Sequence, residues 1–416
     1  MSAADPDAPR PSSPLRLSAV ALSAGLVGGA LQTAFRWTVG QLSSGFWTIV
    51  ERVRATPAGW LAVVVVVAGA GALAAAFASR FFPEAAPGAL PRSREPDDRA
   101  PLKIRWWALP VNFLGTGAVL STGWPVGPET PGIQIGRFAG RLVSRPVRLD
   151  LADARTISAA GGASGLGVAF DAPLGATIYM VERNPSVTGA RTLAAPLAAG
   201  VAGIAVSRMV LGSEPLYACA APAQPGIARL GLFVLLGAVV GLLGGLYARA
   251  MLGAARRFAG LVRVPLPVRV AAVGCLTGLL ALLGSRYVGP GDVAIRDLLA
   301  GAGPLGTIAV LALLRFVLPP LAFGSGAPGG LFTPALAAGA AVGALFAAVV
   351  GAVLPSSQLS TTSAVVVGMG AFLGAALQVP ITAVVLTLEA TQAYELWLPM
   401  AAAVFAATTV SATLQP

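Results

Sequence analysis

The chain has 416 residues, of which 56% are hydrophobic and 11% are charged, whereas roughly 25% of the residues in ordinary soluble domains are charged. This composition excludes a soluble globular protein and predicts an all-α polytopic membrane protein. Histidine is absent, which excludes Ser-His-Asp and Cys-His catalytic sites, histidine-ligated metals and haem. We therefore expect no enzyme, no metal site and no cofactor.

The formal net charge of +11 comes almost wholly from arginine, because Lys103 is the only lysine. Most arginines lie in short loops between apolar segments, as the positive-inside tendency predicts. We therefore attribute the charge to membrane topology and expect no nucleic-acid partner. The expected cytoplasmic loops are 92–105, 137–148 and 249–263.

Residues 1–16 are predicted to form a disordered N-terminal tail, because they are rich in Pro, Ala and Asp and lack the order of a signal peptide. Residues 17–416 are predicted to form one transmembrane domain with two halves, about 17–215 and 226–416. Its apolar segments contain many of the 51 glycines and 33 prolines, so we expect short, broken and tilted helices.

The expected helical segments follow in chain order. Those of the first half are 17–31, 58–81, 106–122, 157–182 with a break at 171–173, and 194–211. Those of the second half are 227–248, 268–283, 305–323, 335–354, and 364–389 with a break at 378–380.

One motif occurs once in each half. Gly127-Pro128-Glu129-Thr130-Pro131 is followed by Gly136, and Gly330-Leu331-Phe332-Thr333-Pro334 is followed by Gly339, so both fit Gly-x-x-Thr-Pro-x-x-x-x-Gly. Internal repeats with interrupted helices at matching positions are typical of secondary transporters and related channels, whose site lies at the repeat interface. The repeat therefore predicts a transport site.

A second landmark recurs in the same order. Glu182 lies nine residues after Pro173, and Glu389 lies nine residues after Pro380. Two landmarks in register favour a duplication, although spacing alone does not decide between parallel and inverted repeats. We expect Glu182 and Glu389 to pair with arginine or to cap loops.

The repeated motif has the form of a helix start that can hold an anion. Unpaired amides and the aligned peptide dipoles make a helix N-terminus positive, glycine lets the backbone approach closely, and proline fits the first turn. Glu129 is a candidate gate and proton carrier, because an ionised carboxylate fills an anion site and a protonated one swings away. The alternative is an interfacial carboxylate that reaches water or pairs with arginine.

From about Phe81 to Val410 the chain resembles the CLC family of chloride channels and chloride/proton antiporters. Residues 324–334 are similar to the family's G-x-F-x-P signature with its preceding glycine-rich loop, and residues 127–136 resemble G-[KR]-E-G-P-x-x-Q-I-G. Residues 105–111 and 169–174 also correspond. The resemblance implies a divergent bacterial-type member without cytoplasmic nucleotide-binding domains.

The resemblance further implies inverted repeats and a homodimer in the bacterial inner membrane. The implied partners are the lipid bilayer, chloride or another small anion, and, for an antiporter, protons. It makes Glu129 the external gating glutamate. The anion-binding residues that it implies are Gly88, Ala89, Leu90, Glu129, Thr130, Leu331, Phe332 and Thr333.

Several departures from the family pattern affect the expected mechanism. Gly88 stands where the family's first motif has an anion-binding serine, and Arg183 stands where the antiporters have an internal glutamate. Pro128 replaces a basic residue beside the gate and removes an amide donor. The chain ends at Pro416, before the helix that would carry the family's anion-coordinating tyrosine.

These departures favour a channel-like or weakly proton-coupled anion transporter. Two alternatives stay open. One is a chloride/proton antiporter in which another internal acid replaces the missing one, and the other is a degenerate paralogue that does not transport.

Overall fold

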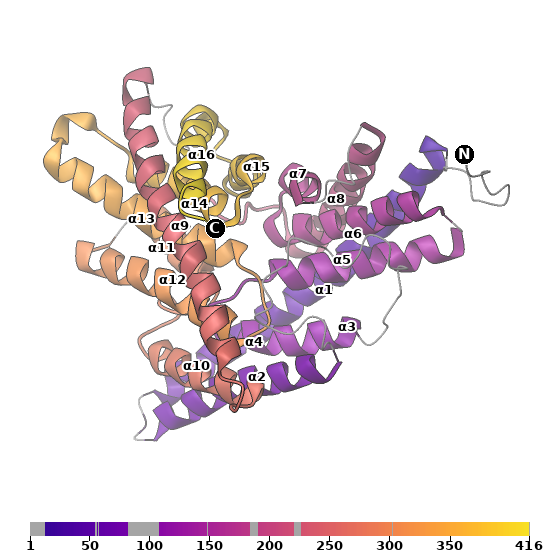
Figure 1. Cartoon of the computed structure of the whole chain (residues 1–416), viewed down its shortest axis with the longest axis horizontal. Helices are drawn as coiled ribbons and strands as arrows, with labels where there is room; N and C mark the ends of the chain where they lie inside the picture. The colour runs from indigo at the N-terminus through magenta and orange to yellow at the C-terminus, as the bar shows by residue number, and fades with distance from the viewer. Residues whose placement is uncertain are drawn as a thin grey trace.

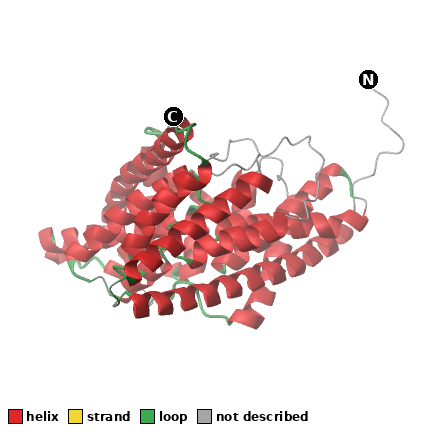
Figure 2. Cartoon of the chain, turned by 90° about the horizontal axis from the view of Figure 1, so that it is seen from below, coloured by secondary structure: helices red, strands yellow, loops and turns green. Residues whose placement is uncertain are grey.

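The computed structural model describes residues 13–54, 56, 58–81, 108–147, 149–183, 190–219, 226–301 and 303–415. Within these ranges all regular elements are helical, and Figure 2 shows only helices and loops there. Seven of the described helices are long and apolar enough to cross a membrane. The prediction of an all-α polytopic membrane protein is confirmed.

The helices fall into two series (Figure 1). The first contains α1 (Pro14–Val53), α2 (Gly59–Phe81), α3 (Ala108–Val111), α4 (Gly117–Ser121), α5 (Glu129–Ser144), α6 (Leu151–Phe170), α7 (Pro173–Arg183) and α8 (Ala190–Leu211). The second contains α9 (Leu230–Gly260), α10 (Leu266–Ala281), α11 (Asp292–Ala300), α12 (Leu305–Ser325), α13 (Phe332–Val353), α14 (Thr361–Leu377), α15 (Pro380–Thr391) and α16 (Trp397–Ala412).

Both long interrupted segments break in the same way. After α6 the residue Asp171 adopts a left-handed conformation with φ 54°, and α7 begins at Pro173. After α14 the residue Gln378 has the same φ of 54°, and α15 begins at Pro380. The two predicted breaks are confirmed, and α5, α6 and α7 correspond to α13, α14 and α15.

Glycines bring the central helices of each half into contact. A Cβ on Gly136 of α5 would lie 2.0 Å from the carbonyl oxygen of Gly161 in α6. In the second half, a Cβ on Gly339 of α13 would lie 2.3 Å from the carbonyl oxygen of Gly368 in α14. The last glycine of the repeated motif is therefore a helix-packing residue, as is common between membrane helices.

Several expected boundaries were wrong. The first helix continues far beyond residue 31, since no proline interrupts it there and the polar residues Gln41, Ser43 and Ser44 remain helical. It starts at Pro14, inside the expected tail, where Ser13 caps it. The expected loops 137–148 and 249–263 are largely the ends of α5 and α9, because arginine is a good helix former. The expected loop 92–105 lies outside the described residues.

The expected helix at 106–122 is also not continuous. Its described part consists of α3, a π-helical turn at Asn112–Thr116, and α4. Such turns interrupt helices locally. The segment thus ends well before Glu129 and leads into the repeated motif as an irregular chain.

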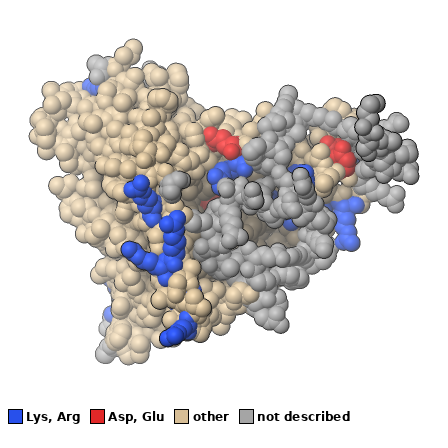
Figure 3. All heavy atoms as spheres, viewed as in Figure 1, with Lys and Arg blue, Asp and Glu red and all other residues tan. Residues whose placement is uncertain are grey.

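The outer surface agrees with a membrane location. Figure 3 shows that uncharged side chains cover most of the described part of one face, with a few basic clusters. Many large apolar side chains are exposed on the helices, among them Leu73, Met209, Leu313 and Phe405. Contiguous apolar surface of this kind suits lipid rather than water.

Candidate anion site where two helices begin

The two copies of the repeated motif lie side by side. The amide of Gly127 donates to the carbonyl of Gly330 at 2.8 Å, and the amide of Gly330 donates to the carbonyl of Gly127 at 2.7 Å. Because α5 begins at Glu129 and α13 begins at Phe332, both helices start from this antiparallel contact. The positive ends of two helix dipoles therefore meet inside the bundle.

The side chain of Glu129 fills the space at this junction. The residue is 1% exposed, and its Oε1 accepts a hydrogen bond of 2.8 Å from the amide of Thr333 in the first turn of α13. The second oxygen, Oε2, is buried without a hydrogen-bond partner. A carboxyl oxygen thus lies where a helix start would bind an anion, and the alternative of an exposed, interfacial Glu129 is wrong.

Two glycines make room for this carboxylate. A Cβ on Gly127 would lie 2.0 Å from Oε2 of Glu129, and a Cβ on Gly330 would lie 2.6 Å from its Cδ. Contacts this short leave no space for any side chain. The glycines at the start of both motif copies therefore form the cavity that the carboxylate occupies.

Aromatic rings pack beside the junction. Phe332, the first residue of α13, contacts Tyr179 of α7 in a T-shaped arrangement with ring centroids 5.0 Å apart. The ring centroid of Phe170, at the end of α6, lies 5.9 Å from that of Phe332. Phe332 is 5% exposed, so the start of α13 is enclosed by the helices on both sides of the first-half break.

The structure brings only some of the predicted site residues together. Leu331, Phe332 and Thr333 form the start of α13 next to Glu129. Thr130 is exposed on the first turn of α5, so its hydroxyl does not share the buried junction. The predicted residues Gly88, Ala89 and Leu90 lie outside the described residues.

A buried cation holds a loop that contacts the chain just before the site. Arg315 of α12 is 1% exposed and donates to the carbonyls of Gly289, Arg286 and Val288 at 2.6, 2.8 and 2.7 Å. The amide of Gly289 in turn donates to the carbonyl of Gly123 at 2.7 Å. Sequence reasoning missed Arg315, although a lone arginine within an apolar segment is the signal that marks such residues.

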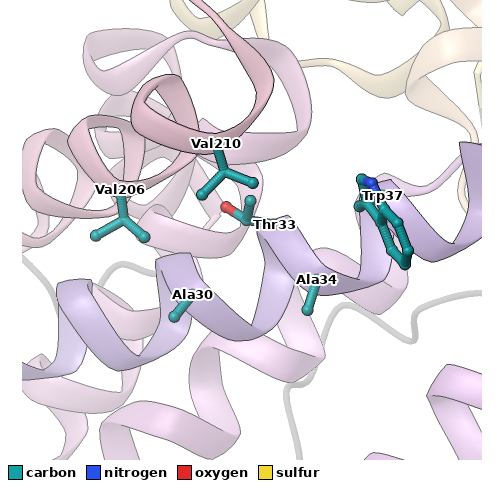
Figure 4. A pocket seen from close by; sticks show the side chains of 6 residues that line it. All are labelled: Ala30, Thr33, Ala34, Trp37, Val206 and Val210. Carbon is teal, nitrogen blue, oxygen red and sulfur yellow. The ribbon is translucent and has the colours of Figure 1, made fainter.

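One groove on the outside of the bundle is separate from the junction. It lies between α1 and α8 and has a volume of about 270 Å³ (Figure 4). Its lining residues are Ala30, Thr33, Ala34, Trp37, Val206 and Val210. None of the candidate anion-binding residues borders it, so it is no part of the candidate site.

Within a bundle of membrane-crossing helices, two short helix starts meet around a buried carboxylate. This architecture defines an integral membrane protein for anion transport, not an enzyme. A family model described as voltage gated chloride channel matches residues 70–412. Since this match covers most of the chain, the protein belongs to that family, the CLC proteins, and has their inverted-repeat fold.

Individual relatives support the same assignment. The chain is 32% identical over 348 residues to the H(+)/Cl(-) exchange transporter ClcA of Vibrio parahaemolyticus, covering 82% of this chain and 74% of that protein. It is 33% identical over 304 residues to ClcA of Citrobacter koseri, covering 71% of this chain and 64% of that protein.

Solved structures share the fold over nearly the whole chain. A slow cyanobacterial Cl-/H+ antiporter has a TM-score of 0.88 at 25% identity, covering 96% of this chain and 95% of its own. A CLC-type fluoride/proton antiporter has a TM-score of 0.78 at 19% identity, covering 96% of both chains. At that lower identity the second structure demonstrates the fold alone.

Proposed function

We propose that this protein moves chloride across the membrane and that Glu129 is the gate. The observation that carries the proposal is the hydrogen bond from the amide of Thr333 to Oε1 of Glu129. An ionised Glu129 competes with chloride for the start of α13. A protonated Glu129 loses this electrostatic attraction, leaves the junction and admits the anion.

The proposed anion site consists mainly of backbone amides. We assign to it the starts of α13 (Leu331, Phe332 and Thr333) and of α5 (Glu129 and Thr130, through their main chain). Gly88, Ala89 and Leu90 complete the proposed site by their resemblance to the family's first motif. Amides suit chloride because they supply positive ends without a fixed full charge that would hold the ion too tightly.

We further propose that transport is weakly coupled to protons. A gate that must bind a proton to open and release it to close moves protons as it cycles, and Oε2 of Glu129 is a free acceptor for that proton. The names of the ClcA relatives and of the cyanobacterial antiporter support exchange. Arg183, at the end of α7, favours weak coupling because a permanently charged guanidinium does not relay protons.

The second candidate is uncoupled, channel-like anion flow. The observation that favours it is again Arg183, together with the engagement of Glu182. Both carboxylate oxygens of Glu182 accept hydrogen bonds from the start of α15, so this neighbouring acid is not a free replacement for the internal glutamate.

Purified protein in liposomes separates these functions. With an outward chloride gradient, and with valinomycin letting potassium leave so that charge stays balanced, chloride and proton fluxes are recorded simultaneously. We expect chloride efflux that drives proton entry, with fewer protons per chloride than in the ClcA relatives assayed in parallel. Chloride efflux without proton movement would establish the channel-like function, and no anion flux at any pH would refute transport altogether.

We also propose a homodimer in the inner membrane of a bacterium, as the family resemblance implies. Chemical cross-linking of the protein within native membranes tests the assembly. A dimer band that persists when the protein is diluted into excess lipid supports it, and a monomer under those conditions contradicts it.

A further inference from the structure

The glutamate of the second half caps a helix of the first half. Glu389 lies on α15 and is 8% exposed. Its Oε1 accepts a hydrogen bond of 3.1 Å from the amide of Leu174, and its Oε2 accepts one of 2.7 Å from the amide of Gly175. These are amides of the first turn of α7, which have no partner within their own helix.

The glutamate of the first half does the same for the second half. Glu182 lies on α7, and its two oxygens accept hydrogen bonds of 2.9 Å each from the amides of Ile381 and Thr382. The hydroxyl of Thr382 also donates to Glu182. The start of α15 is thus capped from α7, while the start of α7 is capped from α15.

We call this pair of interactions the crossed caps, namely Glu182 on α15 and Glu389 on α7. The sequence had suggested arginine partners or loop caps for both glutamates, and that expectation was wrong. Arg208, near the end of α8, pairs instead with Asp171 at 2.8 Å. The charge of Glu389 is therefore balanced mainly by the amides and the dipole of α7.

The crossed caps fix two helices that otherwise have hinges at their starts. Each helix follows a left-handed residue, Asp171 before α7 and Gln378 before α15. The helices cross closely, since a Cβ on Gly175 would lie 2.6 Å from Cα of Leu386. A carboxylate at each end of this crossing holds the two helices in one register.

This register reaches the candidate anion site through α7. Tyr179 lies between the capped start of α7 and Glu182, and its ring packs edge-on against Phe332. Phe332 is the first residue of α13, whose amides belong to the proposed site. Any tilt of α7 about its start would move the Tyr179 ring relative to Phe332.

We propose that Glu182 and Glu389 are positioning residues for anion transport. The crossed caps hold α7 against α15, and α7 holds Tyr179 against Phe332, which sets the width of the path at the start of α13. The transport part of this inference rests on the proposed function, whereas the crossed caps themselves do not.

Hydrogen exchange followed by mass spectrometry tests the crossed caps without any transport assay. In Glu389→Gln, peptides covering the start of α7 should exchange about tenfold faster, and those at the start of α15 should change less. In Glu182→Gln the pattern should reverse. Glu395→Gln, an exposed acid near the end of α15, is the matched control and should leave both regions unchanged.

The transport assay tests the positioning role. When the crossed caps are weakened, we expect the permeability ratio of thiocyanate, the larger anion, to chloride to rise severalfold. The rise should be greater in Glu389→Ala than in Glu389→Gln, because glutamine keeps one acceptor oxygen. A loss of folded protein would lower both fluxes equally and leave their ratio unchanged. The ratio therefore separates positioning from stability.

Each result has a definite meaning. Faster exchange throughout the chain, or only in the helix that carries the mutation, overturns the crossed caps. A crossed exchange pattern with an unchanged thiocyanate-to-chloride ratio overturns the positioning role. If the unmutated protein moves no anion, the proposed function fails, and the exchange experiment still decides whether the crossed caps exist.

Discussion

Thr333 donates its main-chain amide to the carboxylate of Glu129, and these two residues come from opposite halves of the chain. In the proposed mechanism an anion at the start of α13 needs the same donor. Carboxylate and anion therefore exclude each other. The charge on Glu129 decides which of them is bound, and four predictions follow from this arrangement and its supports.

Replacing Glu129 by glutamine should remove the pH dependence of chloride flux. In the unmutated protein, flux should rise as pH falls, because protonation neutralises the carboxylate and weakens its hold on the start of α13. Glutamine is neutral at every pH, so Glu129→Gln should show severalfold higher flux at neutral pH and a flat profile. Liposome chloride efflux between about pH 4 and pH 8 measures this.

The same variant should also abolish proton movement driven by chloride. A control is Glu214→Gln, which changes an exposed acid and should retain the original profile. If Glu129→Gln keeps a steep pH profile, another group is the gate.

Replacing Gly330 by alanine should impair anion binding. The new Cβ would lie 2.6 Å from Cδ of Glu129 and would occupy the cavity even when the carboxylate has left. Overpacking of a tight site costs about 1–3 kcal/mol, so we expect the apparent chloride affinity to fall about tenfold or more. Chloride-dependent flux at several concentrations gives that affinity.

Gly306 is a matched control because a Cβ there would meet nothing within 4 Å. Gly306→Ala should transport like the unmutated protein. Equal chloride affinity in Gly330→Ala and Gly306→Ala would place the anion elsewhere.

Replacing Gly339 by alanine should destabilise the fold. Its Cβ would lie 2.3 Å from the carbonyl oxygen of Gly368, so α13 and α14 would have to separate, at a cost of about 1–3 kcal/mol. Thermal unfolding in detergent should occur at a lower temperature. Gly351→Ala, on the same helix with nothing within 4 Å of the added Cβ, should unfold no earlier than the unmutated protein.

Replacing Arg315 by methionine should loosen residues 286–289, which contact Gly123 on the chain leading to the gate. Three carbonyls, those of Arg286, Val288 and Gly289, would lose their donors, and hydrogen bonds from charged groups contribute about 1.5–3 kcal/mol each. We expect a loss of stability of at least about 2 kcal/mol and faster hydrogen exchange in residues 284–291.

Arg315→Lys should rescue little, because one ammonium cannot reach the same set of carbonyls as the planar guanidinium. Arg257→Met, at an exposed position of α9, is the control. Unchanged exchange around residue 289 in Arg315→Met would contradict the anchoring role.

The sequence contained enough information for the centre of this arrangement. The repeated motif located the starts of α5 and α13 and singled out Glu129. A motif that recurs at matching positions can be recognised from the sequence alone, because recognising it needs no knowledge of how the helices pack. Pro173 and Pro380, with the polar residues just before them, likewise predicted both helix breaks. What the motif did not reveal is that Gly127 and Gly330 bond to each other, since pairing between halves depends on the tertiary fold.

Other features were beyond the reach of local patterns. The length of α1 was underestimated because it continues past residue 31 through a mostly exposed and partly polar stretch, in which only Phe46 and Val50 are buried beyond Phe35, so apolar periodicity does not mark it. Thr130 was expected at the anion site, yet its side chain is exposed, because the motif fixes the main chain there and not the direction of the side chain. The partners of Glu182 and Glu389 lie about 200 residues away in sequence.

The crossed caps also bear on how the chain acquires its structure during synthesis. The residue that caps α7, Glu389, lies 215 positions after Leu174, so the ribosome releases α7 into the membrane long before its cap exists. Until then the first-turn amides of α7 need another acceptor, such as water or a lipid headgroup. Each half thus completes a helix start of the other, and in the first half expressed alone the start of α7 would depend on such a substitute acceptor.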